Sequence, residues 1–325
     1  MDAEYTMKAV LYTRYGPPDA LQLVDVPRPV PRDTQVLVKV LAASANALDW
    51  RPLTFPPLVL RLMGGGAPKP RDPSFGADLA GVVESVGPKV TQFKAGDAVF
   101  GVATGSFAEY ARAEESKIAL KPANVAFDLA AATPTAGCTA LQGLRDKGKL
   151  QPGQDVLIYG ASGGVGTFGV QIAKFFKARV TAVCSTRNMD MVLSIGADEA
   201  IDYTNRDFAS SPHRYDLIIA VNGSRPILHY WRALKPAGIC VVLGGSFAQI
   251  IPAIILGPLL SRVGRKKIQF MLARSNQEDL IFLSHLLDQR NVVPVIDRRH
   301  PLAEVPQAMI YLIEEHPRGK VIITP

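Results

Sequence analysis

The chain has 325 residues, 48% of them hydrophobic and 20% charged, which is typical of a globular protein of about two domains and excludes a disordered or fibrous one. The formal net charge of +7 is spread along the sequence, with clusters at 262–267 and 298–300. No helix-turn-helix pattern or aromatic and basic module accompanies it, so we expect no nucleic-acid partner. Three separated cysteines in apolar surroundings, with no C-x-x-C pair and no secretory leader, predict buried thiols and a cytoplasmic location.

The first third of the chain alternates short β-rich runs with turn residues, which predicts a small, strongly bent β domain. Strands are expected at 7–12, 36–43, 79–86, 98–102 and 107–111. A loop over 54–73, rich in proline and glycine, interrupts this pattern. Loops of that length within a compact domain are usually functional, so we expect it to border a ligand.

From about Asn124 the pattern changes to alternating helices and strands. A helix is predicted at 129–146 despite Pro134, and strands around Val156, Val180, Ala200, Leu217 and Ile239 are separated by helical segments. This rhythm indicates a parallel sheet covered on both faces. Further on, the pattern predicts a strand at 268–272, a helix at 276–289, a strand at 293–296, a helix at 302–314 and a strand at 320–323.

The run from Gly153 to Lys174 indicates a dinucleotide site. A buried strand over 156–159 leads into Ala161-x-Gly163-x-x-Gly166, and a helix with apolar residues on one face follows over 165–176. Glycines in such a turn let backbone amides approach a pyrophosphate at the helix N-terminus. The turn predicts cofactor contacts from residues Ser162, Gly163, Gly164, Val165 and Gly166.

The end of the next strand predicts which nucleotide binds. An acidic residue at the end of strand 179–184, about 20 residues beyond the glycines, would accept the ribose hydroxyls of NAD. The chain has Ser185, Thr186 and Arg187 there instead, which suit a 2′-phosphate. We therefore expect NADPH, against the alternative that Arg187 is a solvated loop residue.

Together these residues resemble the zinc-free quinone oxidoreductase and enoyl reductase branch of the medium-chain dehydrogenase/reductase superfamily. The resemblance extends to Phe75–Val83, to the segment from Gly196 to Tyr203, and to Gly319–Ile322. It implies an α/β fold with a GroES-like β-rich domain at 1–124, a Rossmann domain with a doubly wound parallel sheet at 125–266, and a C-terminal return at 267–325 that completes the first domain. In that family the cleft between the domains holds the nicotinamide.

The resemblance also bears on metal and chemistry. Zinc-dependent relatives carry a cysteine just before the Asn46 region and a His-Glu pair where this chain has Ala77-Asp78. Ser44, Asn46 and Ala77 cannot replace thiolate, imidazole or carboxylate ligands, so we expect no metal site. Without a Lewis acid, hydride delivery to a quinone or to the β-carbon of an α,β-unsaturated carbonyl is the expected reaction.

The resemblance places Asn46 next to the nicotinamide, where its amide can hold the carboxamide or a substrate oxygen, and Arg51 close by, where a cation can stabilise an enolate. Many relatives have tyrosine where this chain has Arg51. Because a guanidinium stays charged near neutral pH, water would then supply the proton. The structural alternative is that Asn46 caps a turn and Arg51 faces solvent.

Further cofactor contacts follow from the resemblance alone. Thr139 begins a helix under the nicotinamide in relatives, although a hydroxyl there could also be an ordinary helix cap. The cofactor cleft is further lined by Tyr203, Asn222, Gly223, Leu243, Gly244 and Gly245. Lys320 is mapped to the cofactor as well, against the alternative of a solvated surface lysine.

The segment 247–260 is nearly continuous apolar sequence and is followed by Arg262, Arg265, Lys266 and Lys267. It carries two prolines and is shorter than the roughly 18 to 20 residues that a spanning helix needs. It is expected either to form an apolar wall of the substrate cleft or a homodimer interface, or to contact a membrane surface through 247–267. Both readings favour a small apolar enone or quinone substrate.

Three functions remain open at this level. The first is NADPH-dependent reduction of quinones or of enone double bonds, and the second is carbonyl reduction to an alcohol without metal. The third is a non-catalytic NADPH-binding sensor or membrane-surface partner, because function depends on the site rather than on the fold.

Overall fold

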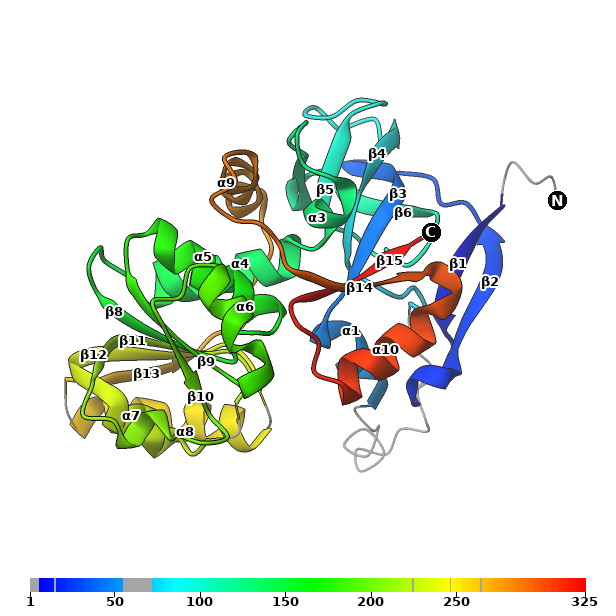
Figure 1. Ribbon diagram of the computed structural model, residues 1–325. Coiled ribbons are helices and arrows are strands. Elements are labelled where there is room, and N and C mark those ends of the chain that lie inside the picture. Colours follow the sequence, from blue (N-terminus) through cyan, green and yellow to red (C-terminus); the bar gives the residue numbers. More distant parts are fainter. Residues whose placement is uncertain (1–5, 15, 55–71, 224, 246, 264) are drawn as a thin grey trace. The chain divides into compact units, whose positions relative to one another are not determined.

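The computed structural model describes residues 6–14, 16–54, 72–223, 225–245, 247–263 and 265–325, without the side chains of 51–54, 247, 248 and 263 (Figure 1). The chain forms two compact units. The first comprises Met1–Thr135, Ser275–Asp288 and Ile296–Pro325, and the second comprises Ala136–Arg274 and Gln289–Val295. The predicted loop over 54–73 lies almost entirely outside the described residues.

The first unit is a β domain. A two-stranded sheet pairs β1 with β2, and a seven-stranded sheet has the order β14-β15-β3-β4-β5-β7 with β6 paired to β3. The strands are β1 (Thr6–Tyr12), β2 (Leu21–Pro27), β3 (Gln35–Ala45), β4 (Asp78–Val86), β5 (Ala98–Val102), β6 (Tyr110–Glu114), β7 (Ile118–Leu120), β14 (Ile296–Pro301) and β15 (Lys320–Thr324). The α-helices of this unit are α1 (Ala47–Thr54), α3 (Phe127–Ala131), α9 (Gln277–Asp288) and α10 (Val305–Glu314). Short 3-10 turns lie at Pro18–Ala20, Glu115–Lys117 and Leu302–Glu304.

The sequence prediction for this unit was right for most strands and wrong in four places. β2 and β7 were missed, and the strand expected at 107–111 begins only at Tyr110, because Phe107 and Ala108 bond to β1 instead. The helix expected at 129–146 is interrupted. α3 ends at Ala131, and the Thr133 hydroxyl donates to the Leu129 carbonyl just beyond it. Pro134 begins a new helix, because a proline disfavours helical geometry in the residue before it.

The strand expected at 293–296 is also wrong. Residues 293–295 are not in a strand, and β14 begins at Ile296. The side chain of Gln171 takes the place of a strand partner there: its amide accepts from the Val293 N–H at 2.8 Å and donates to the Val293 carbonyl at 3.0 Å. A side chain that satisfies the backbone in this way leaves no sequence pattern of a strand or of a helix.

The second unit is a doubly wound parallel sheet with the order β10-β9-β8-β11-β12-β13, as expected for a Rossmann fold. The strands are β8 (Asp155–Tyr159), β9 (Arg179–Cys184), β10 (Glu199–Asp202), β11 (Tyr215–Ala220), β12 (Leu234–Val242) and β13 (Lys267–Phe270). The α-helices are α4 (Pro134–Gln142), α5 (Gly164–Phe175), α6 (Met189–Ser194), α7 (Ile227–Ala233) and α8 (Phe247–Val263). A π-helical turn lies at Gly143–Lys147, and 3-10 turns lie at Thr186–Asn188 and Phe208–Ser210.

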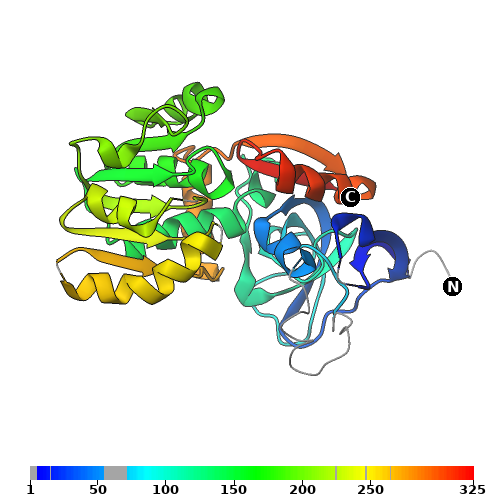
Figure 2. The ribbon, with the colours of Figure 1, turned by 90° about the horizontal axis from the view of Figure 1, so that it is seen from below.

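Helices cover both faces of this sheet. α5 and α6 lie on one face and α7 and α8 on the other (Figures 1 and 2). The strands between them are buried on both sides, so their sequences are continuous apolar runs such as Val156-Leu157-Ile158. The three cysteines are buried and free, as predicted.

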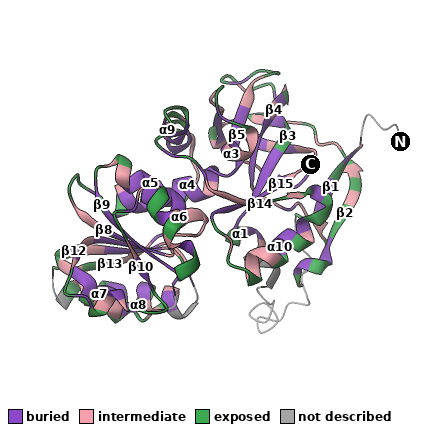
Figure 3. Cartoon of the chain, viewed as in Figure 1, coloured by how far each residue is buried: buried purple, intermediate pink, exposed green. Residues whose placement is uncertain are grey.

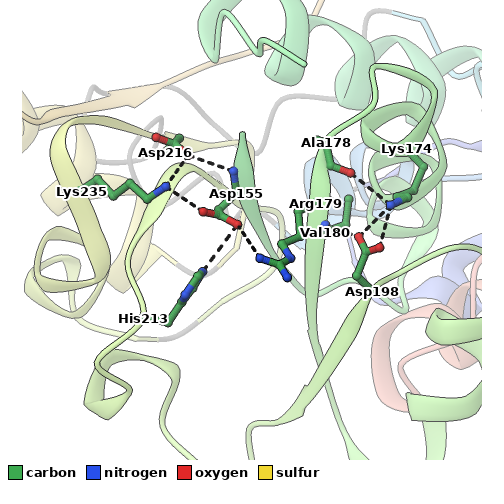
Figure 4. A network of polar contacts seen from close by, with 9 residues as sticks. All are labelled: Asp155, Lys174, Ala178, Arg179, Val180, Asp198, His213, Asp216 and Lys235. Atoms are coloured by element: carbon green, nitrogen blue, oxygen red, sulfur yellow. Dashed lines mark hydrogen bonds and ion pairs between the residues drawn. The ribbon is translucent and has the colours of Figure 1, made fainter. Parts of the chain in front are cut away.

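Charged side chains gather near the amino ends of these strands (Figure 4). The Lys235 ammonium lies 2.7 Å from an Asp155 carboxylate oxygen and 2.8 Å from one of Asp216, which come from β12, β8 and β11. The same Asp216 carboxylate accepts the Asp155 N–H at 2.9 Å. These bonds join three neighbouring strands at their starts. The ligand site expected at the carboxyl ends lies at the opposite edge.

Candidate active site

The glycine turn of the second unit has the geometry of a pyrophosphate site. Gly160 follows β8 with φ +80°, and Gly163 is the residue before α5. A Cβ at Gly166 would lie 2.1 Å from the Gly160 carbonyl oxygen, so a side chain there has no room. The N–H groups of Gly164, Val165 and Gly166 have no intrahelical acceptor, and no backbone carbonyl of the described chain accepts from them. Three outward amides at a helix N-terminus fit a bound phosphate.

Asn188 joins this turn to the end of β9, and the sequence analysis gave it no role. Its side chain is 3% exposed, and its amide nitrogen donates to the Ser162 hydroxyl at 3.0 Å and to the Ser185 hydroxyl at 3.2 Å. Its amide oxygen is buried and accepts no hydrogen bond from the residues that the structure describes. A buried acceptor without a donor suits a ribose hydroxyl. The role of Asn188 follows from its contacts with Ser162 and Ser185, and the sequence does not show that these residues lie close together.

The predicted phosphate contacts after β9 divide into two kinds. Arg187 is exposed, and Ser185 uses its oxygen as an acceptor, so both remain compatible with a 2′-phosphate. Thr186 is different, because its hydroxyl donates to the Asp202 carboxylate through a short bond. The prediction that Thr186 donates to the cofactor therefore disagrees with this arrangement.

Asp202 is itself fully engaged at the end of β10. Besides the Thr186 bond, it accepts from the Thr204 N–H and hydroxyl at 2.9 and 2.7 Å and from the Asn205 amide at 2.8 Å. These bonds, the one from Thr186 first, hold the pKa of Asp202 below its usual value. The carboxylate stabilises its own turn and has little capacity left for a ligand.

Tyr203 lies beside a second cation that the sequence analysis missed. The Tyr203 ring is 40% exposed and stacks on Tyr159, with ring centroids 6.3 Å apart. Arg225, in the loop after β11, donates to the Tyr203 carbonyl at 3.3 Å. Burial raises the pKa of Tyr159, and a hydrogen bond to Arg225 opposes that rise. An aromatic face with an adjacent guanidinium can pack against a nucleotide base.

The other predicted cofactor residues of this unit meet at the carboxyl ends of β8, β11 and β12. Tyr159, Ala220 and Val242 are in register there, so the residues after them lie at one edge: Gly160, Asn222, Gly223, Leu243, Gly244 and Gly245. A Cβ at Gly223 would lie 2.4 Å from the Gln249 side-chain oxygen, and Gly245 has φ +109°. Gln249 also donates to the Gly244 carbonyl at 2.9 Å. Gln249, on α8, thus fills the space beside Gly223 and fixes the backbone at this edge of the sheet.

Thr139 is 8% exposed and is the sixth residue of α4. It is therefore not at the start of a helix, and the alternative that it is an N-terminal cap is wrong.

A buried polar cluster surrounds Asn46 in the first unit. Asn46 is 8% exposed and stands between β3 and α1. Its amide oxygen accepts from the Lys320 ammonium at 2.5 Å, its amide nitrogen donates to the Ser44 carbonyl at 3.2 Å, and its backbone N–H donates to the Asp49 carboxylate at 2.7 Å. Three separate bonds therefore fix the position and the orientation of this amide.

Strand register brings the cluster together. β3 pairs with β15 through Ala45 and Val321, which places Lys320 opposite Asn46. β3 also pairs with β4, which places Asp78 opposite Ser44. Because both partners come from neighbouring antiparallel strands, three segments far apart in sequence contribute to one site.

Asp78 supplies the counter-charge of the cluster. It is fully buried, its carboxylate accepts from the Thr135 N–H at 3.1 Å and from the Thr135 hydroxyl at 2.5 Å, and it lies 3.9 Å from the Lys320 ammonium. Burial raises the pKa of Asp78, and Lys320 opposes this. Burial lowers the pKa of Lys320, and Asp78 and Asp49 oppose this.

Asp49 is the group of this cluster that titrates near neutral pH. Burial first, and then the charge of Asp78, raise the pKa of Asp49 from 3.8 to about 7. With Asp78 ionised and Lys320 protonated, the cluster is neutral when Asp49 is protonated and carries one negative charge when it is not. Asn46 and Lys320 were predicted as site residues, whereas Asp49 and the pairing of Asp78 with Lys320 were not.

The solvated-surface alternative for Lys320 is wrong, since only 3% of the residue is exposed. The side chain of Arg51 lies outside the described residues, so its predicted role stays a prediction. Among the described residues, no group of three His, Cys, Asp or Glu side chains is placed to hold a metal ion.

Comparisons with known proteins agree with this arrangement. Residues 32–123 match the family model for an alcohol dehydrogenase GroES-like domain, and residues 195–323 match that for a zinc-binding dehydrogenase. A 2-methylene-furan-3-one reductase of Solanum lycopersicum is 35% identical over 98% of this chain and 79% of its own. An NADPH-dependent alkenal/one oxidoreductase of Arabidopsis thaliana is 32% identical over 98% of this chain and 80% of its own.

A solved structure, the quinone oxidoreductase from Coxiella burnetii, is 31% identical and superimposes with a TM-score of 0.86 over 98% of this chain and 99% of its own. The chain belongs to the zinc-free quinone oxidoreductase branch of the medium-chain dehydrogenase/reductase superfamily. A member of this branch is an oxidoreductase that uses a nicotinamide nucleotide. In this chain, the glycine turn offers a site for the nucleotide phosphates, and the Asn46 cluster offers polar groups for the reaction.

Proposed function

We propose that the protein reduces quinones, or the C=C bond of α,β-unsaturated carbonyl compounds, with NADPH. The observation that carries the proposal is the Asn46 amide, which a buried ammonium holds and polarises. Relatives named for the same chemistry support it: a 2-methylene-furan-3-one reductase, an alkenal/one oxidoreductase and a quinone oxidoreductase.

NADPH is the proposed cofactor. When bound, its nicotinamide supplies the hydride. The amides of Gly164, Val165 and Gly166 would hold the pyrophosphate, the Asn188 amide oxygen a ribose hydroxyl, and the exposed Arg187 the 2′-phosphate. The name of the alkenal/one oxidoreductase, which includes NADPH, supports this choice of nucleotide.

The Asn46 cluster supplies electrostatic stabilisation in this proposal. Negative charge develops on the substrate oxygen when a hydride reaches the β-carbon or a quinone. Lys320 withdraws electron density from the Asn46 amide oxygen and so makes the amide N–H that does not donate to the Ser44 carbonyl a stronger donor toward that charge. Because burial lowers the local dielectric, the donor acts more strongly here than it would in water.

Proton delivery is assigned to solvent. A guanidinium at residue 51 cannot act as an acid near neutral pH. The Asp49 carboxyl, with a pKa of about 7, instead sets the charge of the cluster: protonated Asp49 leaves it neutral and favours a developing anion.

A substrate panel tests the proposal. We expect NADPH oxidation with apolar enones and with quinones, a lower rate with NADH, and a saturated ketone as the product from an enone. An allylic alcohol from the same enone would instead indicate carbonyl reduction. Tight NADPH binding with no turnover of any member of the panel would indicate the non-catalytic sensor and contradict the proposal.

A further inference from the structure

Helix α8 presents large apolar side chains to solvent. Ile251, Ile254, Ile255 and Leu259 are 50%, 51%, 58% and 52% exposed, and their spacing places them on one face. Two positions turned toward the sheet hold small residues: Ala253 is 1% exposed, and a Cβ at Gly257 would lie 2.9 Å from the Ile268 carbonyl oxygen. Of the larger inward residues, Gln249 is buried and Leu260 packs partly against the core. Buried and exposed positions alternate along α8 (Figure 3). A helix that only covered a sheet would have the opposite pattern, with large apolar residues inward and polar residues outward.

Basic residues without acidic neighbours follow this face. Residues 217–277 hold no Asp or Glu and carry eight cations: Arg225, Arg232, Lys235, Arg262, Arg265, Lys266, Lys267 and Arg274. Arg262, Arg265 and Lys267 are exposed at the carboxyl end of α8. No carboxylate in the part of the chain that the structure describes forms an ion pair with any of these three. Their charges are therefore available to an anionic partner.

We infer that α8 lies on the surface of an anionic lipid bilayer, with Ile251, Ile254, Ile255 and Leu259 in the boundary between headgroups and acyl chains and the three cations on lipid phosphates. An apolar helix face with a basic border is the combination that binds such surfaces. The contact is interfacial: no helix of the described residues is long and apolar enough to cross a membrane.

Charge favours lipid over a second copy of the chain. A two-fold contact centred on α8 would place the same surface on both partners. Two segments without a single carboxylate would then face one another, and their cations would repel. An anionic bilayer satisfies the apolar face and the cations together.

Vesicle flotation of the full chain tests this inference. The probes are phosphatidylcholine vesicles and vesicles of phosphatidylcholine and phosphatidylglycerol in a seven-to-three ratio, at low and at high salt. We expect binding to the anionic vesicles only, weakened by salt. The Arg262→Gln, Arg265→Gln, Lys267→Gln variant should bind less by about fivefold for each cation removed. The Ile255→Gln, Leu259→Gln variant should bind at least about tenfold less.

Matched controls change the same chemistry elsewhere. Arg14→Gln, Lys94→Gln, Lys147→Gln removes three other exposed cations, and Val30→Gln, Leu120→Gln removes two other exposed apolar side chains. Both controls should float like the wild type. Equal loss in the controls, or no loss in the α8 variants, would overturn the inference. So would sedimentation that shows a dimer dissociated by Ile255→Gln, Leu259→Gln while the wild type binds no vesicle, since a second copy would then cover α8. Reductase activity without vesicles is a separate readout and does not decide this point.

Discussion

The Lys320 ammonium donates to the Asn46 amide oxygen at 2.5 Å, although 274 residues separate the two in sequence. Both side chains are buried, and among the residues that the structure describes the buried carboxylates near the ammonium are Asp49 and Asp78, the latter at 3.9 Å. The last strand of the chain thus positions a residue at the end of the third strand. The proposed chemistry depends on this bond.

Removal of Lys320 should therefore damage both stability and turnover. Lys320→Met leaves the Asp78 charge buried without its cation, and we expect the free energy of unfolding to fall by about 3 to 5 kcal/mol. The Lys320→Met, Asp78→Asn double variant should regain most of that loss, because an amide oxygen can still accept from Thr135. Turnover should stay at least about tenfold low in both, since the Asn46 amide has lost its donor. Wild-type turnover in the double variant would show that Lys320 is only structural.

Asp49 should make stability depend on pH. Its pKa of about 7 in the folded state exceeds 3.8, so the folded state holds this proton more tightly than the unfolded one. The contribution of Asp49 to the free energy of unfolding is then fully present below about pH 4. It is lost as the pH rises through about 7, and its total is on the order of 4 kcal/mol. Asp49→Asn should flatten the dependence of stability on pH in denaturant titrations, because an amide does not titrate. Its oxygen can still accept from the Asn46 N–H, so the local structure is kept. An unchanged slope would contradict the assignment.

A second variant separates charge from hydrogen bonding at this position. Asp49→Ala removes the acceptor as well, and it should be less stable than Asp49→Asn by about 1 to 3 kcal/mol.

Gly166 should be essential to nucleotide binding. In Gly166→Ala the Cβ meets the Gly160 carbonyl, which forces the turn to move, and we expect NADPH affinity to fall at least about tenfold in calorimetry. Gly169→Ala is the matched control on the same helix, because its Cβ would be 3.4 Å from the Ile158 side chain and fits with little change. Equal affinities for the two variants would be incompatible with a phosphate site at this turn.

Arg187 should select NADPH over NADH. Arg187→Met removes the proposed partner of the 2′-phosphate, so the Kd for NADPH should rise about tenfold while that for NADH stays the same. Arg179→Met, at the amino end of β9, the strand before Arg187, should change neither Kd. If Arg187→Met weakened the binding of NADPH and NADH equally, Arg187 would have a structural role instead.

The sequence predicted the fold well where patterns are local. The glycine turn and the apolar strands of the second unit carry their own signatures, and so does the order of strands and helices around them. The interruption at Pro134 and the Gln171 contact with Val293 were missed, because tertiary contacts override the local pattern there. The same limit applies to the site: Asn188 and Asp49 act through neighbours that register and burial provide, and no spacing in the sequence shows these.

Lys320 illustrates the limit further. Its sequence context, a lysine after a glycine near the end of the chain, suits a surface position equally well. Only the pairing of β15 with β3 brings it under Asn46.

The most direct test of the central claim follows the hydride itself. Turnover of an enone with NADPH deuterated at C4 of the nicotinamide, followed by NMR of the product, identifies the carbon that accepts the deuterium. We expect deuterium at the β-carbon of a saturated ketone. Deuterium at the carbinol carbon of an allylic alcohol would contradict it, as would the absence of any transfer from NADPH to enones and of any quinone reduction.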